Sequence, residues 1–133
     1  MALIYEDITT KILAACFEVS KELGAGFLES VYQNALMIAL QEKGLTVERE
    51  HPLAVSFRGQ IVGQFYADIL VEDKIIVELK AVNALTDVHK AQVINYLKAT
   101  GIEVGLLINF GNPKLEYRRF DNRFLQEIKV QRQ

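Results

Sequence analysis

The chain has 133 residues, of which half are hydrophobic, a formal net charge of −2 and one cysteine. This length suits a single domain over residues 1–133, with enough apolar side chains for a core. The lone Cys16 excludes an internal disulfide and a zinc cluster built on cysteines. No apolar run approaches the ~20 residues that span a bilayer, and the N-terminus lacks a signal-peptide pattern. We therefore expect a cytoplasmic protein that does not cross a membrane.

The charge distribution bears on nucleic-acid binding in two opposite ways. An acidic chain is a poor candidate for coating DNA through bulk electrostatics, which favours basic domains. Residues 114–133, however, carry six basic and three acidic groups. This basic end either lines one side of a nucleic-acid groove or is an ordinary solvated tail, and the sequence leaves both interpretations open.

Two amphipathic helices are predicted at the start of the chain. Apolar residues recur at helical spacing over Glu6–Leu23 and again over about Leu28–Lys43. The segment Gly24–Gly26 ends the first helix, and Gly44 is a natural residue to end the second. Both helices precede any predicted strand.

The middle of the chain changes to β character. Alternating and β-branched residues predict three strands joined by tight turns, at Thr46–Phe57, Ile61–Val71 and Ile75–Lys80. Asp87 then has the position of an N-cap for a third helix, which we expect to run to about Ala99.

The remaining elements complete an order of ααβββαβ(β). They are an apolar strand at Glu103–Phe110, an extended segment at Leu115–Phe120 and a short helix at Asn122–Lys129. This order predicts an α+β or mixed α/β fold, with a mixed central sheet flanked by helices. The strand after the third helix would lie parallel to Ile75–Lys80.

The third predicted strand has an acid and a base on one face. Strand alternation places Ile75, Val77 and Leu79 on one side and Glu78 and Lys80 on the other. An acid and a base therefore share one face of a strand, which is unusual in so apolar a segment.

Register decides whether Asp68, on the preceding strand, lies beside Glu78. A two-residue turn would set Asp68 opposite Val77, on the wrong face. A three-residue turn over residues 72–74 sets Asp68 opposite Glu78 and gathers the apolar residues of both strands on the other face. The hydrophobic pattern favours this second register. Two adjacent carboxylates need a countercharge, and oxygen ligands suit Mg²⁺ or Mn²⁺.

Such a site is suited to hydrolysis. A metal held by Asp68 and Glu78 would lower the pKa of bound water, while Lys80 would orient the nucleophile or stabilise developing charge. The plainer alternative is a surface salt bridge between Glu78 and Lys80, with Asp68 capping a loop. These three residues alone do not separate the two interpretations, because a D…ExK pattern is common by chance.

Two further motifs favour the functional interpretation. The third predicted helix carries a Gln-x-x-x-Tyr motif, whose two side chains face the same way. A Gly-x-x-Glu-x-x-Tyr motif begins the second helix. With the D…ExK residues, the chain resembles the PD-(D/E)XK nuclease superfamily. The resemblance points to the RecB-type and lambda-exonuclease-like branch with the QxxxY motif, and to the GxxExxY family. It extends from about Ile8 to Phe120 and rests on Gly26, Glu29, Tyr32, Asp68, Glu78, Leu79, Lys80, Gln92 and Tyr96.

The resemblance implies a restriction-endonuclease-like core and a metal site. Asp68, Glu78 and the backbone carbonyl of Leu79 would hold the metal, and Glu29 would be the helix-borne acid of the site. Lys80 would be the catalytic lysine. By itself, Glu29 is better explained as a first-turn acid that complements the dipole of its helix.

It also implies roles for residues around the metal. Gln92 and Tyr96 would bind the scissile or adjacent phosphate and hold the lysine in place; otherwise they are a half-exposed helix face. Tyr32 and His89 form a second tier. Tyr32 is expected to be a packing residue whose hydroxyl binds a site carboxylate, and His89 could approach the phosphate or be a surface residue.

The expected function is a Mg²⁺- or Mn²⁺-dependent nuclease that hydrolyses phosphodiester bonds of nucleic acid, with DNA favoured over RNA. The alternative is a catalytically silent nuclease-fold module that binds nucleic acid or a partner protein, which the acidic net charge and small size favour. A chain of this size would gain groove area by forming a homodimer.

Overall fold

The structure, a computed structural model, describes residues 3–122, which form three helices and five strands. In chain order the elements are α1 (Glu6–Leu23), α2 (Glu29–Glu42), β1 (Val47–Phe57), β2 (Gln60–Val71), β3 (Ile75–Lys80), α3 (Asp87–Thr100), β4 (Val104–Asn109) and β5 (Glu116–Asp121). The predicted elements within these residues are confirmed. The final helix predicted at Asn122–Lys129 lies outside the described residues, apart from Asn122.

The five strands form one sheet in the order β1-β2-β3-β4-β5. Neighbouring strands are antiparallel except β3 and β4, which are parallel and are connected through α3. A parallel pair needs a crossover connection, and α3 provides it. The predicted mixed sheet is therefore confirmed, including the parallel strand after the third helix.

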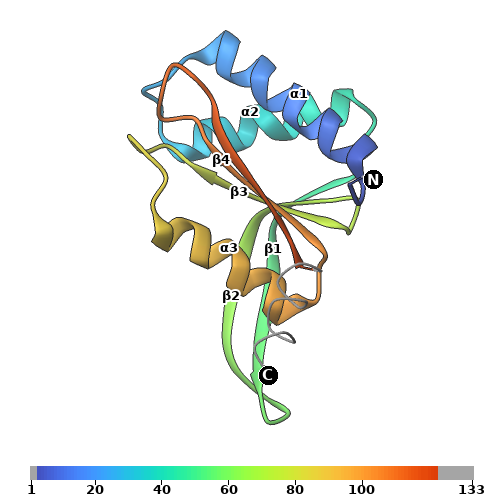
Figure 1. The fold of residues 1–133 in the computed structure, drawn as a ribbon. Helices are drawn as coiled ribbons and strands as arrows, with labels where there is room; N and C mark the ends of the chain where they lie inside the picture. The colour runs from blue at the N-terminus through green and yellow to red at the C-terminus, as the bar shows by residue number, and fades with distance from the viewer. Residues whose placement is uncertain (1–2, 123–133) are drawn as a thin grey trace.

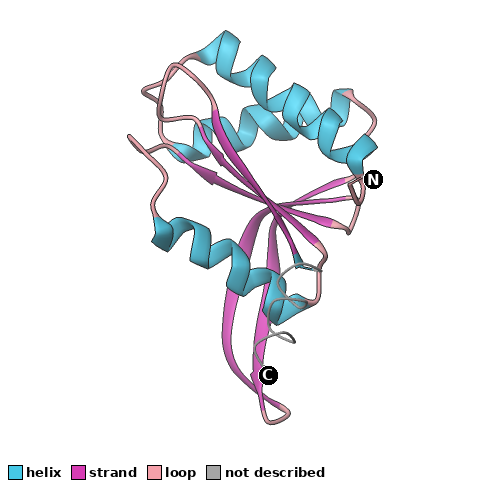
Figure 2. Cartoon of the chain, in the orientation of Figure 1, coloured by secondary structure: helices cyan, strands magenta, loops and turns pink. Residues whose placement is uncertain are grey.

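The helices cover the two faces of the sheet unequally. Helices α1 and α2 lie together on one face, while α3 lies on the other (Figures 1 and 2). The β1–β2 hairpin is long, and its turn projects past α3 and away from the other two helices (Figure 1). Among residues 3–122, no helix has both the length and the apolar character needed to cross a membrane.

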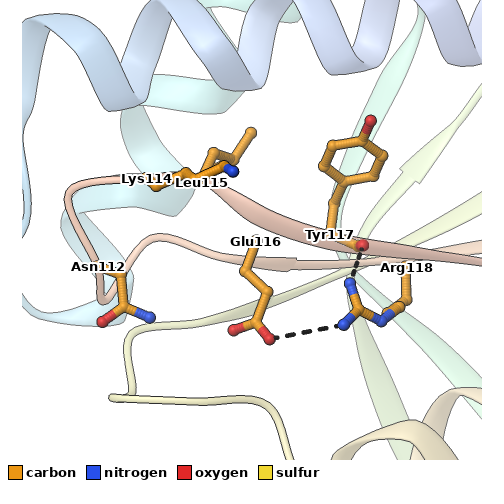
Figure 3. Close-up of a pocket in the computed structure, with 6 residues that line it drawn as sticks. All are labelled: Asn112, Lys114, Leu115, Glu116, Tyr117 and Arg118. Atoms are coloured by element: carbon orange, nitrogen blue, oxygen red, sulfur yellow. Dashed lines mark hydrogen bonds and ion pairs between the residues drawn. The ribbon is translucent and has the colours of Figure 1, made fainter.

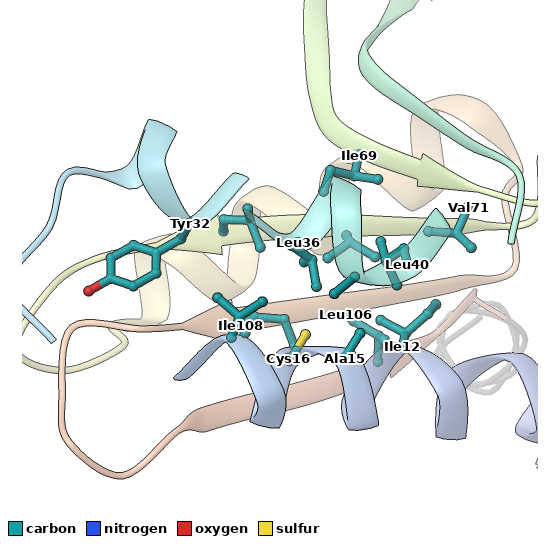
Figure 4. Packing of buried hydrophobic residues seen from close by; sticks show 14 of the residues in the cluster. Ile12, Ala15, Cys16, Tyr32, Leu36, Leu40, Ile69, Val71, Leu106 and Ile108 are labelled. Carbon is teal, nitrogen blue, oxygen red and sulfur yellow. The ribbon is translucent and has the colours of Figure 1, made fainter. Parts of the chain in front are cut away.

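The larger core lies between the sheet and the pair α1 and α2. Side chains of both helices interdigitate there with those of β2, β3 and β4 (Figure 4). Fully buried examples are Ile12, Leu36 and Leu40 from the helices and Ile69 and Leu106 from the strands. Burying a side chain of this size contributes ~1.5–3 kcal/mol, so this layer dominates the stability of the fold.

Cys16 is part of this core. Its side chain is fully buried, and burial raises the pKa of its thiol well above the ordinary range. A thiol that stays protonated is a poor nucleophile, which agrees with a structural role as a small apolar side chain.

A second, smaller core lies beneath α3. It consists of Leu53, Ala67, Leu70, Ile76 and Leu97. Because Ile76 faces α3 while its neighbours Ile75 and Val77 face α1 and α2, strand β3 is buried on both sides. The even-numbered face of β3, which includes Glu78, therefore faces α3.

The N-terminus of α3 differs from the sequence prediction in its cap. Thr86, not Asp87, is the N-cap, and its hydroxyl oxygen accepts a hydrogen bond from the backbone N–H of His89 at 3.4 Å. Asp87 lies one residue later, in the first turn, where its charge still favours the helix dipole. The prediction of the cap was wrong by one residue because both side chains are good N-cap candidates.

Candidate active site

Asp68 and Glu78 come together where the pairing of β2 and β3 ends. The strands pair from Val71–Ile75 to Ile69–Val77, which confirms the register predicted for a three-residue turn. Beyond that pair, the backbone N–H of Asp68 donates to Oε1 of Glu78 at 2.9 Å. The backbone N–H of Leu79 donates to Oδ2 of Asp68 at 2.8 Å. The two carboxylates thus continue the ladder with their own oxygens and are held side by side.

Burial sets the protonation of this pair. Glu78 is only 3% exposed, and burial, followed by the charge of Asp68, raises its pKa to about 8. Burial also raises the pKa of Asp68, an effect that the hydrogen bond from Leu79 opposes. Two buried carboxylates disfavour each other's charged forms, and a nearby cation would reverse this effect.

Lys80 lies within electrostatic range of all three predicted acids. Its positive charge lowers the pKa of Glu29, Asp68 and Glu78, in each case against the larger effect of burial. Lys80 is half-buried at the end of β3, where its backbone carbonyl accepts a hydrogen bond from Phe110 at 2.9 Å. The fold therefore brings the helix-borne acid, the acid pair and the lysine into one electrostatic neighbourhood.

Glu29 reaches this neighbourhood from the first residue of α2. Its side chain shares a cavity of about 230 Å³ with the acid pair's Asp68, and the lining residues are Glu29, Ser30, Gln33, Glu50, Asp68 and Leu79. Burial, followed by the charge of Asp68, raises the pKa of Glu29. The placement beside Asp68 supports the interpretation of Glu29 as part of the site, beyond its effect on the helix dipole.

Tyr32 has a different partner from the one predicted. Its hydroxyl donates to the carbonyl of Gly24 at 2.6 Å and accepts from the backbone N–H of Phe27 at 3.2 Å. Its ring is fully buried and stacks on Phe110 at 4.7 Å. The packing role is confirmed, but the expected bond to a site carboxylate is wrong. Tyr32 instead fixes the loop that leads into Glu29.

Gln92 and Tyr96 approach from α3, on the other side of the sheet. The amide of Gln92 donates to the hydroxyl of Tyr96 at 2.7 Å, and the ring of Tyr96 stacks on Phe65 at 4.0 Å. Burial, followed by the charge of Glu78, raises the pKa of Tyr96, so its hydroxyl lies within the field of the acid pair. Within the described part of the chain neither residue forms a hydrogen bond with Lys80, so their predicted roles toward lysine and phosphate stay predictions.

His89 caps its own helix. Its Nδ1 accepts a hydrogen bond from the backbone N–H of Thr86 at 3.1 Å, while its own backbone N–H donates to the Thr86 hydroxyl. This reciprocal pair is a capping box with histidine in the place of the usual Glu or Gln. His89 therefore has a structural function that the sequence prediction did not include.

Glu50 and Gln33 line the cavity and were missed by sequence reasoning. Glu50 lies on β1 between the pairs Arg49–Ile69 and His51–Ala67, which places it across from Asp68. Its backbone has a left-handed φ of 51°, and its charge adds to the rise in the pKa of Asp68 that burial causes first. Gln33 is buried, and its amide donates to the Asp68 carbonyl at 2.9 Å.

Asn109 was also missed, and it holds the segment that follows Lys80. Its fully buried amide accepts from the backbone N–H of Val82 at 3.0 Å and donates to the Val82 carbonyl at 2.9 Å. It also accepts from the N–H of Gly111. This clamp joins the ends of the two parallel strands and so fixes the chain that follows Lys80.

A larger hollow of about 640 Å³ lies apart from the acid pair, along Asn112–Arg118. Figure 3 shows its side chains, among which Glu116 forms an ion pair with Arg118 at 3.9 Å. It contains none of the predicted site residues. Its size reflects the open surface beside β5, so the smaller cavity at Asp68 is the better candidate for chemistry.

Comparison with known proteins identifies the family. A family model described as the PD-(D/E)XK nuclease superfamily matches residues 6–120. The chain belongs to the PD-(D/E)XK nuclease superfamily. A search of curated proteins gave no match. Among solved structures, the crystal structure of SSO0001 matches with a TM-score of 0.55 and 16% sequence identity, over 97% of this chain and 69% of that one.

This likeness supports the fold expected for the superfamily. Because the sequence identity is low, the match with SSO0001 supports the fold alone. The five-stranded mixed sheet flanked by three helices in residues 3–122 is consistent with a restriction-endonuclease-like core. Asp68 and Glu78-Leu79-Lys80 lie within the matched segment, on β2 and β3.

PD-(D/E)XK nucleases generally use divalent metals. In residues 3–122, no group of three or more His, Cys, Asp and Glu side chains is already gathered for metal binding. The donor chemistry nevertheless fits a hard cation, because Asp68 and Glu78 are adjacent oxygen ligands whose raised pKa values a cation would lower. Two carboxylates, a carbonyl and water would form such a site.

Proposed function

We propose that this member of the superfamily is a Mg²⁺- or Mn²⁺-dependent nuclease that hydrolyses phosphodiester bonds in nucleic acid, with DNA as the preferred substrate. The observation that carries the proposal is the pairing of Asp68 with Glu78 beside Lys80, whose charge acts on both carboxyls. The plainer alternative, a surface salt bridge between Glu78 and Lys80, does not account for a glutamate that is 3% exposed. Burying two adjacent carboxylates costs free energy unless hydrogen bonds or a cation compensate their charge, which is the physical reason to expect a metal here.

Each site residue has a role in this proposal. Asp68, Glu78 and the carbonyl of Leu79 hold the metal, with Glu29 as a further acid on the cavity side. The metal, when bound, supplies a low-pKa water and Lewis-acid stabilisation of the phosphate. Lys80 orients the nucleophile or stabilises developing negative charge, and the clamp on the following segment keeps it in place.

The residues on α3 have the second set of roles. Gln92 and Tyr96 bind the phosphate next to the scissile bond, and their mutual hydrogen bond sets the direction of both polar groups. We further infer the GxxExxY family and the QxxxY branch from the motifs at Gly26–Tyr32 and Gln92–Tyr96. A cytoplasmic location and a homodimer belong to the same proposal, and light scattering tests the dimer.

Cleavage assays on purified protein test the activity. With Mg²⁺ or Mn²⁺, the wild-type protein should cut members of a panel of labelled single- and double-stranded DNA and RNA. Lys80→Ala should lower the rate at least ~100-fold, because it removes a group that stabilises transition-state charge. Lys98→Ala, at an exposed lysine of α3, is the matched control and should cut normally.

Two results would contradict the nuclease. One is the absence of cleavage under every metal and substrate condition, and the other is full activity in Lys80→Ala. The acidic net charge of −2 favours the second candidate, a silent module that binds nucleic acid or a protein. Calorimetric titration with Mn²⁺ separates the two, since a metal site that weakens in Glu78→Ala favours the enzyme.

A further inference from the structure

The tip of the β1–β2 hairpin is an extended ribbon with little cover. We call residues 54–64 the β1–β2 arm. All of its residues are exposed except Val55, which is half-buried. Figure 1 shows the arm projecting beyond α3, away from the body of the protein. A two-stranded ribbon without a further layer is marginally stable in water, so this one is a candidate for contact with a ligand.

The arm exposes large apolar side chains. Phe57 is 58% exposed, Ile61 is 71% exposed and Val62 is 63% exposed. The guanidinium of Arg58 lies 4.8 Å from the centre of the Phe57 ring, so the tip combines a cation with an aromatic face. A cluster of this kind on a projecting ribbon indicates a binding surface.

The charge of this region identifies the kind of partner. The chain has 17 acidic residues in 133, yet residues 51–67 contain none. Its His51 is paired with the Glu48 carboxylate at 2.6 Å, so Arg58 at the tip is the cation that a phosphate can reach. In a protein with a net charge of −2, the tip around Arg58 is a strip that has no carboxylates of its own. Exposed aromatic and apolar groups beside a guanidinium suit bases, which stack or pack on such side chains.

The arm is continuous with the candidate active site. Strand β2 runs from the arm directly to Asp68, and Tyr66, which is 57% exposed, lies between them. The seven residue-to-residue steps from Ile61 to Asp68 span roughly 23 Å at the rise of a strand. That length corresponds to roughly seven base-pair steps at about 3.4 Å each.

We propose that the β1–β2 arm binds the nucleic acid on one side of the scissile phosphate, over roughly seven base pairs. This inference rests on the proposed nuclease function, because it places the substrate at Asp68. A two-stranded ribbon has the width to enter a major groove. Through the arm, a small acidic nuclease can bind nucleic acid without a large net positive charge.

Binding measured without metal tests the arm separately from catalysis. The probes are fluorescein-labelled DNA duplexes of about 8 and about 24 base pairs, and single strands of the same lengths, followed by anisotropy in EDTA. The arm variant is Phe57→Thr combined with Ile61→Thr and Val62→Thr, since threonine favours strands. The matched control is Ile38→Gln, which replaces an apolar side chain on α2 that is 60% exposed.

The arm variant should bind the longer duplex or strand at least about tenfold more weakly than wild type, with much less effect on the shorter probe. The Ile38→Gln variant should bind as wild type does. Arg58→Glu, which places an acid in the strip, should give the same length-dependent loss if the triple variant folds poorly. Light scattering on each protein reports its oligomeric state.

Three results would overturn the proposal. They are equal affinity of wild type and both arm variants for the longer probes, no wild-type binding to any probe, and a dimer that becomes a monomer in the variant at unchanged affinity. The last would make a second copy of the chain the partner. A wild type that binds through its arm but never cuts supports the arm and contradicts the nuclease. A wild type that cuts nucleic acid, together with arm variants that bind as tightly as wild type, supports the nuclease and contradicts the arm.

Discussion

The burial of Glu78 predicts how the stability of the folded protein depends on pH. Burial, followed by the charge of Asp68, raises its pKa from the ordinary value of 4.5 to about 8. The folded protein therefore binds this proton more tightly than the unfolded chain does. The stabilisation is complete below about pH 4.5 and is lost as the pH rises to about 8.

We therefore expect the metal-free wild type to lose stability between pH 5 and pH 8, by on the order of a few kcal/mol. Glu78→Gln keeps an oxygen acceptor for the N–H of Asp68 but carries no charge. The variant should lose most of this pH dependence and be the more stable protein at pH 8. Urea unfolding in EDTA at several pH values measures both.

Added Mn²⁺ provides the complementary measurement. It should stabilise the wild type at pH 8, because a cation favours the charged carboxylates, and it should stabilise Glu78→Gln much less. Identical pH profiles for the two proteins would show that Glu78 ionises normally and would remove the electrostatic argument for a metal at this position.

Glu50 lies near Asp68 in the structure, although its sequence neighbours do not indicate this. It stands in Glu48-Arg49-Glu50, a run that is typical of a solvated edge strand. Only the pairing of β1 with β2 places it across from Asp68. Its backbone has a left-handed φ of 51°, which is unusual for glutamate in a strand. The residues around it in the sequence do not indicate this conformation.

At the scale of elements, the start of α2 depends on Tyr32. The Gly-x-x-Glu-x-x-Tyr motif has a physical explanation in the structure, because the tyrosine hydroxyl bridges the carbonyl of Gly24 and the N–H of Phe27. The bridge fixes the loop immediately before Glu29. The glutamate and the tyrosine of the motif thus have separate functions, one in the site and one in holding the site's position.

Tyr32→Phe should cost about 1–2 kcal/mol of unfolding free energy, because it leaves two backbone groups without their partner. It should also lower cleavage, since Glu29 loses its fixed approach to the cavity. Tyr117→Phe, at a ring that is 41% exposed, is the matched control and should change neither property. An unchanged unfolding midpoint in Tyr32→Phe would show that the bridge is energetically unimportant.

At the scale of the whole molecule, the ends of β3 and β4 are locked together at Gly111. A Cβ built on Gly111 would lie 2.0 Å from the carbonyl oxygen and 2.4 Å from the nitrogen of Val82. These are backbone atoms and cannot move aside cheaply. The two segments are 29 residues apart in sequence, and their contact sets the path of the chain after Lys80.

Gly111→Ala should therefore destabilise the protein by about 3 kcal/mol and reduce cleavage through displacement of Lys80. Gly63→Ala is the matched control, because a Cβ there has no neighbour within 4 Å. Its unfolding free energy should stay within about 0.5 kcal/mol of wild type. Thermal unfolding of both variants and cleavage assays on Gly111→Ala check the expectation, and a wild-type-like Gly111→Ala would disprove the close approach.

Much of the fold was predictable because its signals are local. Helical spacing in α1 and α2 and alternation in β1 to β3 come from side chains a few residues apart. The register of β2 and β3 was also predictable, since only a three-residue turn places Ile69 and Val77 on the same apolar face as their neighbours. The same local reasoning predicted that Asp68 and Glu78 lie beside each other.

Contacts between distant segments could not be predicted in the same way. The partner of Tyr32, the amide clamp of Asn109 and the place of Glu50 each depend on how separate elements approach one another. The cap of α3 was misplaced by one residue because threonine and aspartate are both suitable N-caps. Local chemistry allowed either residue, and the path of the loop selected Thr86.

By itself, the sequence determined the element order, the strand register and the residues that resemble a nuclease site, because hydrophobic periodicity and motif spacing are properties of neighbouring residues. Only the tertiary structure decided that Glu29, Asp68, Glu78 and Lys80 share one electrostatic neighbourhood and that the β1–β2 arm stands clear of the body. Burial and the direction of approach arise when the layers pack, and both the raised pKa values and the exposed arm follow from that packing.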